Sequence, residues 1–386
     1  MELRLKLLVT LTYYYPHWTG LTAYAQRLAE GLAKRGHQIT VLTAQFKSTL
    51  ARAETHNGVR IVRLPTALHL SRGVIMPGFI PTLNRLAKEN DLLQVHTPML
   101  ETNFVTRIGL WQHKPTVITH HGDLVMPQKI SDQMIERIMT ALMTQGEREA
   151  TRITVHSCDY AAHSAFLSPF RSKLDCIYPP VEIPEAQPEV VAQWRAELGL
   201  TQNKLVGFAG RFVEEKGFDY LLQAIPRVRA KIPNVKFVYA GEINVVYERF
   251  FDKWKYLVEQ ERDSIVTLGL LLDPQRLANF YAMNDVFALP SRTDCFPSVQ
   301  IEAMLSGAPV VATDIPGARE VVRVTGMGKL VAPRDPQALA DGLVEVLTRR
   351  DAYMKTRAQI RAIFNTAKTL DEYEKLFETL ITQNEH

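Results

Sequence analysis

Two basic residues in the second half of the chain follow an apolar segment at a spacing suited to a phosphate group. The predicted strand from Lys204 to Ala209 runs into Gly210 and Arg211 and then, after a short loop, into Lys216. Arginine can donate two parallel hydrogen bonds to a phosphate, and lysine can add a mobile point charge. The pair suits a diphosphate whose negative charge grows as it leaves. Taken alone, the same residues would be ordinary solvated cations.

A second candidate site lies at an expected helix start. An apolar strand ends at Pro290, and a helix is predicted to begin near Pro297 or Ser298, because proline fits the first turn of a helix and Gly307 fits just past its end. The first amides of a helix have no partner within the helix and favour anionic oxygens. The backbone at Phe296, Pro297, Ser298 and Val299 is therefore a candidate site for a phosphate or a sugar hydroxyl.

Two carboxylates flank this helix start. Asp294 precedes it and can reach a sugar hydroxyl, and Glu302 lies about one turn inside, where a carboxylate can accept from both hydroxyls of a ribose. The alternative for Glu302 is an ordinary acidic residue favoured by the helix dipole. No Asp-x-Asp pair, the usual partner of a metal on a nucleotide diphosphate, occurs in the chain. We therefore expect Arg211, Lys216 and the helix amides to neutralise the charge without a metal.

The first half of the chain supplies matching candidates. Gly20 stands just before a predicted helix, where its amide could approach a diphosphate. His120 lies at the end of the predicted strand Thr116–His120, and His121 follows it. A loop histidine is commonly structural, but one beyond the carboxyl end of a strand is a candidate to bind the transferred sugar.

The order of these motifs resembles the donor half of retaining glycosyltransferases of family four. Gly-Arg-x4-Lys-Gly is followed by Pro-Ser, by an acidic residue with Glu-Ala eight positions later, and by Gly-x-Pro-Val-Val-Ala. The similarity spans nearly the whole chain and implies the glycosyltransferase B fold, with two Rossmann-like domains. The family usually has Glu in place of Asp294, often Gly in place of Pro297, and a second glycine in place of Thr19.

The resemblance also implies a reaction and a set of roles. It implies transfer with retention of configuration by front-face attack, in which the leaving phosphate helps to deprotonate the acceptor hydroxyl, so no protein nucleophile is assigned. The base edge would be held near Leu270 by backbone groups, which do not distinguish UDP from GDP. The resemblance places Glu320 near the nucleotide; the alternative is that Glu320 simply caps the start of its helix. The predicted catalytic residues are His121, Arg211, Lys216 and Asp294, and the predicted donor-binding residues are Gly20, Gly210, Phe296, Pro297, Ser298, Val299, Glu302, Leu270 and Glu320.

The elements that must position these residues alternate between short apolar runs and helical patterns, which predicts an α/β fold with parallel sheets. A proline-rich stretch from Tyr178 to Pro188 is a predicted linker. Residues 1–184 are expected to form one Rossmann-like domain and residues 185–365 a second, the two facing each other across a cleft. A helix at about 366–386, with apolar residues at helical spacing, is expected to pack back on the first domain.

Composition limits the alternatives. The chain has 386 residues, a formal charge of +4 and 46% hydrophobic residues, which fits a two-domain globular protein and gives no argument for nucleic acid binding. The three cysteines, an odd number without a CxxC pair, favour a reducing compartment, and no signal peptide or membrane span is recognised. We expect a cytoplasmic protein. Basic and apolar residues at 71–90 and 135–152 could contact an anionic membrane, the alternative being core packing with a solvated face.

These observations predict a metal-independent, retaining hexosyltransferase that uses a UDP- or GDP-linked sugar as co-substrate, needs no other cofactor, and acts on a hydroxyl of a glycan or lipid acceptor. A non-catalytic nucleotide-sugar-binding protein is the alternative. A dehydrogenase has little support, since no Gly-x-Gly-x-x-Gly follows either opening strand.

Overall fold

The computed structural model describes residues 4–70, 73–124, 130–243, 245 and 249–384, and the chain divides into two compact units. Unit 1 is Met1–Pro180 with Thr366–His386, and unit 2 is Val181–Asn365. The first boundary precedes the expected one at 184/185. The side chains of Val181 and Ile183 are buried, and Arg357 of unit 2 donates a hydrogen bond from Nη2 to the carbonyl of Ile183 at 2.5 Å, so this part of the linker packs with unit 2.

Unit 1 is built on an eight-stranded sheet in the order β10-β9-β8-β7-β1-β2-β4-β3. Its strands are mostly continuous apolar runs, because a parallel sheet is covered on both faces. All neighbours are parallel, as the sequence predicts, except β3 and β4, which pair antiparallel at one edge of the sheet. The strands are β1 (Lys6–Thr10), β2 (Gln38–Ala44), β3 (Ala53–His56), β4 (Val59–Leu64), β7 (Leu92–Thr97), β8 (Thr116–His120), β9 (Arg152–Val155) and β10 (Leu174–Cys176), beside a separate hairpin of β5 (Leu68–Leu70) and β6 (Gly73–Ile75).

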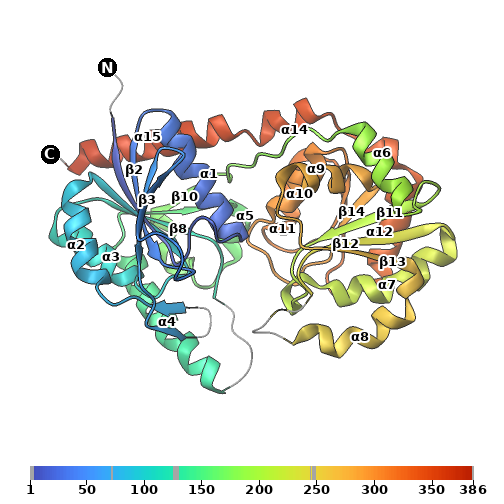
Figure 1. Cartoon of the computed structure of the whole chain (residues 1–386), viewed down its shortest axis with the longest axis horizontal. Coiled ribbons are helices and arrows are strands. Elements are labelled where there is room, and N and C mark those ends of the chain that lie inside the picture. Colours follow the sequence, from blue (N-terminus) through green and yellow to red (C-terminus); the bar gives the residue numbers. More distant parts are fainter. Residues whose placement is uncertain (1–3, 71–72, 125–129, 244, 246–248, 385–386) are drawn as a thin grey trace. The chain divides into compact units, whose positions relative to one another are not determined.

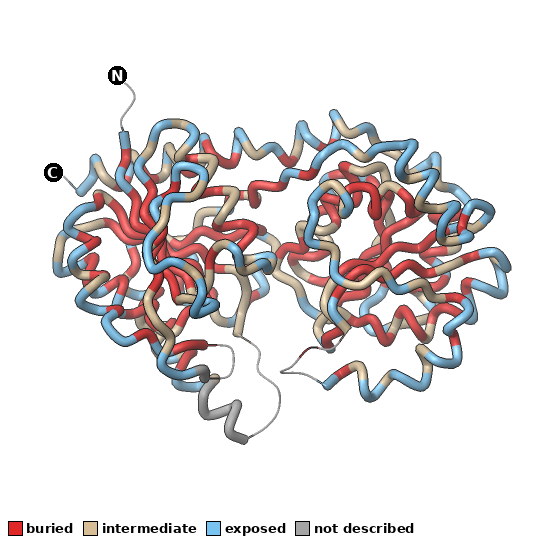
Figure 2. The backbone as a smooth tube through the Cα atoms, in the orientation of Figure 1, coloured by how far each residue is buried: buried red, intermediate tan, exposed pale blue. Residues whose placement is uncertain are grey.

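Helices cover both faces of this sheet, and the buried residues gather in the middle of the unit (Figures 1 and 2). Helices α1 (Gly20–Lys34) and α15 (Thr366–Asn384) share one core with Leu7 and Val9 of β1. Helices α2 (Phe79–Glu89) and α3 (Thr102–Trp111) share the other with Leu8 of the same strand. Helix α4 (Ile130–Glu149) packs on α3, and α5 (Cys158–His163) follows β9.

The C-terminal helix α15 is part of unit 1 through both apolar and polar contacts. Leu370, Tyr373, Phe377 and Leu380 lie at helical spacing and are all buried. The hydroxyl groups of Tyr373 and Tyr24 lie 2.5 Å apart within the core. These contacts join the two ends of the unit, which are separated by the whole of unit 2 in the sequence.

Unit 2 has a six-stranded parallel sheet in the order β13-β12-β11-β14-β15-β16. Helices α7 and α12 cover one face, where Phe208 and Leu221 are core residues, and α9, α10 and α11 follow their strands on the other side of the unit. The elements are α6 (Pro188–Glu197), β11 (Lys204–Ala209), α7 (Phe218–Lys231), β12 (Val235–Ala240), α8 (Phe250–Gln260), β13 (Ile265–Gly269), α9 (Pro274–Met283), β14 (Val286–Leu289), α10 (Ser298–Leu305), β15 (Val310–Thr313), α11 (Ala318–Thr325), β16 (Gly328–Val331), α12 (Pro336–Thr348), α13 (Arg350–Tyr353) and α14 (Arg357–Ile363).

The cysteines differ from the expectation of reduced thiols. Cys158 and Cys176 form a disulfide, with their Cα atoms 5.5 Å apart. Cys158 opens α5 just after β9, and Cys176 ends the neighbouring strand β10, so the parallel pairing of these strands brings the two residues together. Cys295 carries a free thiol.

The fold bears on two features that the sequence analysis linked to a membrane: the methionine-rich helix α4 and the length of the apolar segments. Met139 and Met143 of α4 are buried, so the methionine-rich face of this helix packs into unit 1. Among the described residues, no helix combines the length and the apolar character that a membrane span requires.

Candidate functional site

The phosphate-binding candidates of unit 2 lie where β11 ends. Gly210 and Arg211 follow the strand, and a 3-10 turn at Glu214–Lys216 leads into α7. The Arg211 side chain is 40% exposed, and its Nη2 lies 3.6 Å from a carboxylate oxygen of Glu215. Lys216 Nζ donates to Asp294 Oδ2 at 2.6 Å. Two predicted catalytic residues that are far apart in the sequence therefore form an ion pair.

Local backbone geometry accounts for the glycines of this loop. Gly217 has φ +65°, and a Cβ atom there would lie 2.0 Å from the carbonyl oxygen of Pro290. Gly210 has φ +147°, and its carbonyl accepts a hydrogen bond from the hydroxyl of Tyr239 at 2.7 Å. Glycine adopts such conformations without steric cost. The turn that carries Lys216 can therefore press directly against the loop after β14.

Helix α10 begins at Ser298, as the sequence predicts, and its N-cap residue, Pro297, makes no capping hydrogen bond through its side chain. Phe296 and Pro297 are buried, whereas Ser298 and Val299 are partly exposed. The open end of a helix attracts anionic groups through its amides and its dipole. The helix start, which follows Asp294 closely, is thus suited to a phosphate or hydroxyl ligand.

Glu302 lies inside α10 and is only 6% exposed. The hydroxyl of Tyr281, from α9, donates to Glu302 Oε2 at 3.2 Å. A buried carboxylate needs such donors, because burial of an unpaired charge is costly. A carboxylate can accept several hydrogen bonds, the chemistry that a diol of hydroxyl groups requires.

Glu320 and Leu270 occupy two further positions in unit 2. Glu320 is in the first turn of α11, whose N-cap is Gly317. Asp294 and Gly317 form a β-bridge, and a Cβ atom at 317 would lie 2.3 Å from the carbonyl oxygen of Cys295, so the starts of α10 and α11 are close together. Leu270 directly follows β13 and is 59% exposed. It lies at the carboxyl ends of the strands, as Gly210 and Asp294 do, but β12 separates its strand from β11 in the sheet.

In unit 1, Gly20 is the first residue of α1 rather than the residue before it. Thr19 is the N-cap and forms a capping box with Thr22: Thr22 N donates to Thr19 Oγ1 at 3.3 Å, and Thr19 N donates to Thr22 Oγ1 at 2.6 Å. A Cβ atom at Gly20 would meet no heavy atom within 4 Å. Threonine at 19 thus supplies a cap, and glycine at 20 leaves open space at the helix start.

His121 is the centre of a chain of three histidines. Its Nε2 lies 2.9 Å from Nδ1 of His96, and its Nδ1 lies 3.0 Å from Nε2 of His156. The three residues come from the carboxyl ends of the adjacent strands β7, β8 and β9, and the ring of Tyr24 packs against all of them. Both ring nitrogens of His121 therefore have histidine partners within the protein. The sequence predicted that this side chain binds the transferred sugar, and it did not show that these partners occupy the ring.

Burial keeps this chain uncharged. It lowers the pKa of His96 to about 3, with a further contribution from His156, and lowers the pKa of His156 to about 3, with a contribution from His120. The pKa of His121 also falls well below its usual value, through burial and its histidine neighbours. A neutral imidazole has one donor and one acceptor, so the two hydrogen bonds must run in the same direction along the chain.

His120 has a different environment from its neighbour. Its Nε2 lies 3.1 Å from Asp123 Oδ1, and its Nδ1 lies 3.6 Å from Glu147 Oε1. Burial lowers the pKa of His120, but the two carboxylates outweigh burial and raise it to about 9. Ser164 Oγ also donates to Asp123, at 2.8 Å. His120 is thus a structural cation that anchors the loop after β8.

Family models match both halves of the chain. One described as "Glycosyltransferase Family 4" matches residues 18–184, and one described as "Glycosyl transferases group 1" matches residues 203–349. This chain is a group 1, family 4 glycosyltransferase. The resemblance expected from the sequence is confirmed.

Individual relatives agree with this assignment. The glycosyltransferase is 26% identical over 356 residues to an uncharacterized glycosyltransferase of Methanocaldococcus jannaschii, with 85% of each chain covered. It is 27% identical over 370 residues to the GDP-mannose-dependent alpha-(1-6)-phosphatidylinositol monomannoside mannosyltransferase of Mycolicibacterium smegmatis, with 91% of this chain and 92% of the relative covered.

The solved structure of Anabaena HepE in complex with UDP-glucose matches the glycosyltransferase with a TM-score of 0.78 at 19% identity, covering 97% of this chain and 100% of HepE. At that identity the match concerns the fold. Together with the two parallel sheets, it confirms the glycosyltransferase B fold.

Three residues of the glycosyltransferase next to the predicted site have no role in the sequence analysis: His96 and His156, which contact His121, and Arg292, which binds the backbone of the turn that carries Lys216. The signal available for His96 and His156 was their position where a parallel strand meets its loop. Arg292, in the loop after β14, was not considered. Its position directly between Pro290 and Asp294 was the available signal.

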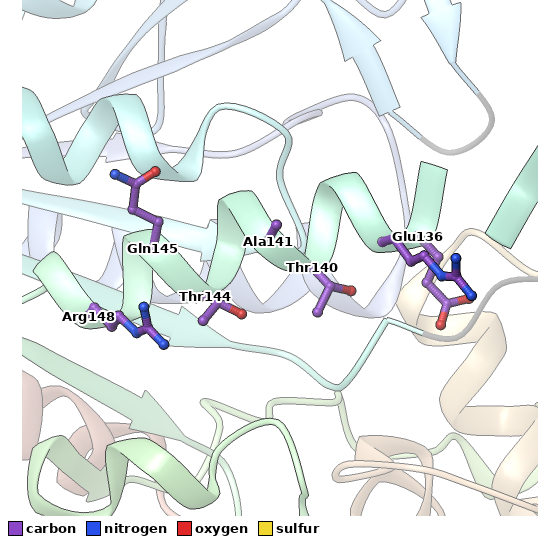
Figure 3. A pocket seen from close by; sticks show the side chains of 7 residues that line it. Glu136, Thr140, Ala141, Thr144, Gln145 and Arg148 are labelled. Carbon is purple, nitrogen blue, oxygen red and sulfur yellow. The ribbon is translucent and has the colours of Figure 1, made fainter. Parts of the chain in front are cut away.

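A hollow of about 680 Å³ lies along one face of α4 in unit 1 (Figure 3). Its lining residues recur at helical spacing and are mostly polar: Glu136, Arg137, Thr140, Ala141, Thr144, Gln145 and Arg148. None of them is a predicted site residue, so the hollow is no evidence for the position of the donor.

Proposed function

We propose that this glycosyltransferase transfers a hexose from a UDP- or GDP-linked sugar to a hydroxyl of a glycan or lipid acceptor, with retention of configuration and without a metal. The observation that carries the proposal is the Lys216–Asp294 ion pair, 2.6 Å long, beside the uncapped start of α10. It combines a cation for phosphate, a carboxylate for a sugar hydroxyl and helix amides for anionic oxygens.

Lys216 would stabilise the charge that develops on the leaving diphosphate. Burial lowers its pKa, but Asp294 and Glu215 outweigh burial and raise it, so the ammonium group stays charged at neutral pH. Arg211 would add a second, more exposed cation. Preorganised cations of this kind stabilise a transition state without reorganising during the reaction.

Asp294 and Glu302 would orient the donor. We assign Asp294 to a hydroxyl of the transferred sugar and Glu302, already held by Tyr281, to the ribose. Leu270 would border the base, Glu320 would lie near the nucleotide, and Gly20 and His121 of unit 1 would contact the diphosphate and the sugar. Since both ring nitrogens of His121 have histidine partners, we assign its contact to the backbone of the His121 loop.

Support for the donor class comes from the relatives. HepE was solved with UDP-glucose, and the mycolicibacterial relative is named for GDP-mannose and a phosphatidylinositol monomannoside. These names support a nucleotide diphosphate sugar as donor and a glycan or lipid as acceptor.

The test is a donor screen with product mass spectrometry, in which UDP-glucose and GDP-mannose are offered with pooled glycan and glycolipid acceptors. We expect transfer that persists in excess EDTA, retains the anomeric configuration by NMR, and falls at least about 100-fold in Lys216→Ala. Loss of transfer in EDTA would refute the metal-free mechanism. Nucleotide binding without turnover on any pair would support the non-catalytic alternative.

We also propose a cytoplasmic location with peripheral contact to an anionic membrane. Leu68 and Ile75 of the β5–β6 hairpin and Ile80 of α2 are 51%, 39% and 48% exposed. Arg85, with a 55% exposed side chain, lies on the same helix as Ile80. Apolar residues with basic neighbours bind anionic membrane surfaces. Flotation with phosphatidylglycerol liposomes, compared with phosphatidylcholine liposomes, tests this contact: failure to float with either would refute it.

A further inference from the structure

Arg292 links the two loops that carry Lys216 and Asp294. Its guanidinium forms a bidentate ion pair with Asp219, in the first turn of α7: Nη1 donates to Oδ1 at 2.8 Å and Nη2 to Oδ2 at 2.7 Å. The side chains of Arg292 and Asp219 are 15% and 1% exposed. A bidentate arginine–carboxylate pair fixes orientation as well as distance.

The same arginine also binds the backbone of the turn that carries Lys216. Nη1 donates to the carbonyl of Glu214 at 2.6 Å, and the Arg292 amide donates to the carbonyl of Glu215 at 2.8 Å. Arg292 therefore contacts the turn just before Lys216 and the helix just after it. Together with the close approach of Gly217 to Pro290, these bonds hold both ends of the turn against the loop after β14.

Aromatic rings complete the surroundings of the guanidinium. Its Cζ lies 4.2 Å from the ring centroid of Tyr220 and 5.6 Å from that of Phe250. The planar group thus has aromatic neighbours as well as hydrogen-bond acceptors, an environment that lysine cannot reproduce. A buried ion pair is not in general more stabilising than well-packed apolar residues, so stability alone is a weak explanation for this arrangement.

We propose that Arg292 is a positioning residue for the donor: it fixes the Glu214–Lys216 turn so that the Lys216 ammonium stays beside Asp294 and the start of α10. The inference rests on the proposed function, because Lys216 is assigned there to the diphosphate. A displacement of a binding group by about 1 Å can cost roughly 100-fold in activity, so such a clamp has a measurable effect.

The chain offers a matched control. Arg229, in the last turn of α7, donates to Glu261 Oε2 at 2.7 Å and to Ser264 Oγ at 2.8 Å, and the Glu261 side chain is 3% exposed. Arg292→Gln and Arg229→Gln each remove an arginine from a buried carboxylate, and α7 supplies one partner of each pair, Asp219 in the first and Arg229 in the second. Only Arg292 contacts the Lys216 turn. Arg292→Lys keeps the charge and removes the planar fork.

The clamp is first tested without ligand, by hydrogen exchange of the full chain. The amides of Lys216 and Gly217 donate to carbonyls within the turn, so their exchange reports its order. We expect exchange of the peptide covering residues 213–218 to be at least about 10-fold faster in Arg292→Gln and unchanged in Arg229→Gln. Equal exchange in wild type and Arg292→Gln would overturn the clamp.

Positioning is then tested by calorimetric titration with UDP and GDP. The dissociation constant of the nucleotide that binds wild type is expected to rise about 10- to 100-fold in Arg292→Gln, less in Arg292→Lys, and not in Arg229→Gln at a temperature where all variants are folded. Equal losses in the two glutamine variants would overturn positioning in favour of a structural role. If wild type bound neither nucleotide, the proposed function would fail, and with it the positioning role, even where exchange confirms the clamp.

Discussion

Acidification should destabilise the glycosyltransferase through the histidine chain of unit 1. His96 and His156 are buried, with pKa values of about 3, whereas an unfolded histidine has a pKa of about 6.5. Below pH 6.5 the unfolded state binds more protons than the folded state, so stability falls as the pH falls. The contribution of the chain is fully present above pH 6.5 and is lost between 6.5 and 3.

The size of the effect follows from the linkage relation. At pH 5, about 1.5 units below the unfolded pKa, each of these two histidines costs about 2 kcal/mol relative to pH 8, and the pair costs about 4 kcal/mol. His121 adds to this loss, since its pKa falls in the same direction. His120 acts oppositely: its raised pKa of about 9 gives stability that is fully present below pH 6.5 and is lost as the pH rises through 9.

The assay is urea unfolding at pH 8, 7, 6 and 5, followed by circular dichroism, for wild type and for His156→Gln. Glutamine can offer a nitrogen near the position of Nε2 but does not titrate. We expect the variant to be less stable at pH 8 and to lose about 2 kcal/mol less than wild type between pH 8 and 5. His163→Gln, at a histidine whose side chain is 52% exposed, is the control and should keep the wild-type slope. The same slope in His156→Gln and wild type would refute a neutral, buried chain.

Three further results are expected. Gly217→Ala should destabilise unit 2 by at least about 2 kcal/mol more than Gly199→Ala in thermal unfolding. Both glycines have positive φ, at +65° and +68°, but only a Cβ atom at 217 would lie against the Pro290 carbonyl. Equal losses of stability in the two variants would argue against that contact. Glu302→Gln should weaken UDP binding about 10-fold or more and should abolish any preference for UDP over 2′-deoxy-UDP, measured by calorimetry; a preserved preference would separate Glu302 from the ribose. Removing residues 366–386 deletes four large buried side chains worth about 2 kcal/mol each and exposes the apolar core of unit 1 that they cover. The truncated chain should therefore bind a hydrophobic dye and lose cooperative unfolding, and a normal transition would contradict the packing of α15.

The strands of both sheets could be predicted from the sequence because most are continuous apolar runs bounded by turn residues. The predicted strands at 116–120 and 204–209 agree with the structure at both ends. Strand β3 was missed, since Ala53–His56 is a polar edge segment without such a run. Its antiparallel pairing depends on β4 rather than on its own composition.

The site could be predicted only where a local motif carries the signal. The start of α10 follows from proline and glycine positions, and the structure agrees with it. The partners of His121 and the Arg292–Asp219 pair arise from contacts between residues far apart in the sequence, which no local pattern encodes. The assignment of Asp294, Glu302 and Lys216 to a donor stays a prediction.

The return of α15 to unit 1 gives the two units unequal independence. Unit 2 is one uninterrupted stretch of chain, so it has all its residues as soon as Asn365 has been synthesised. The core of unit 1 stays incomplete until α15 has left the ribosome, because Leu370, Tyr373 and Phe377 belong to it. We therefore expect unit 2 to be expressible alone as a continuous fragment. An isolated unit 1 would need its C-terminal helix joined to Pro180 by a new connection.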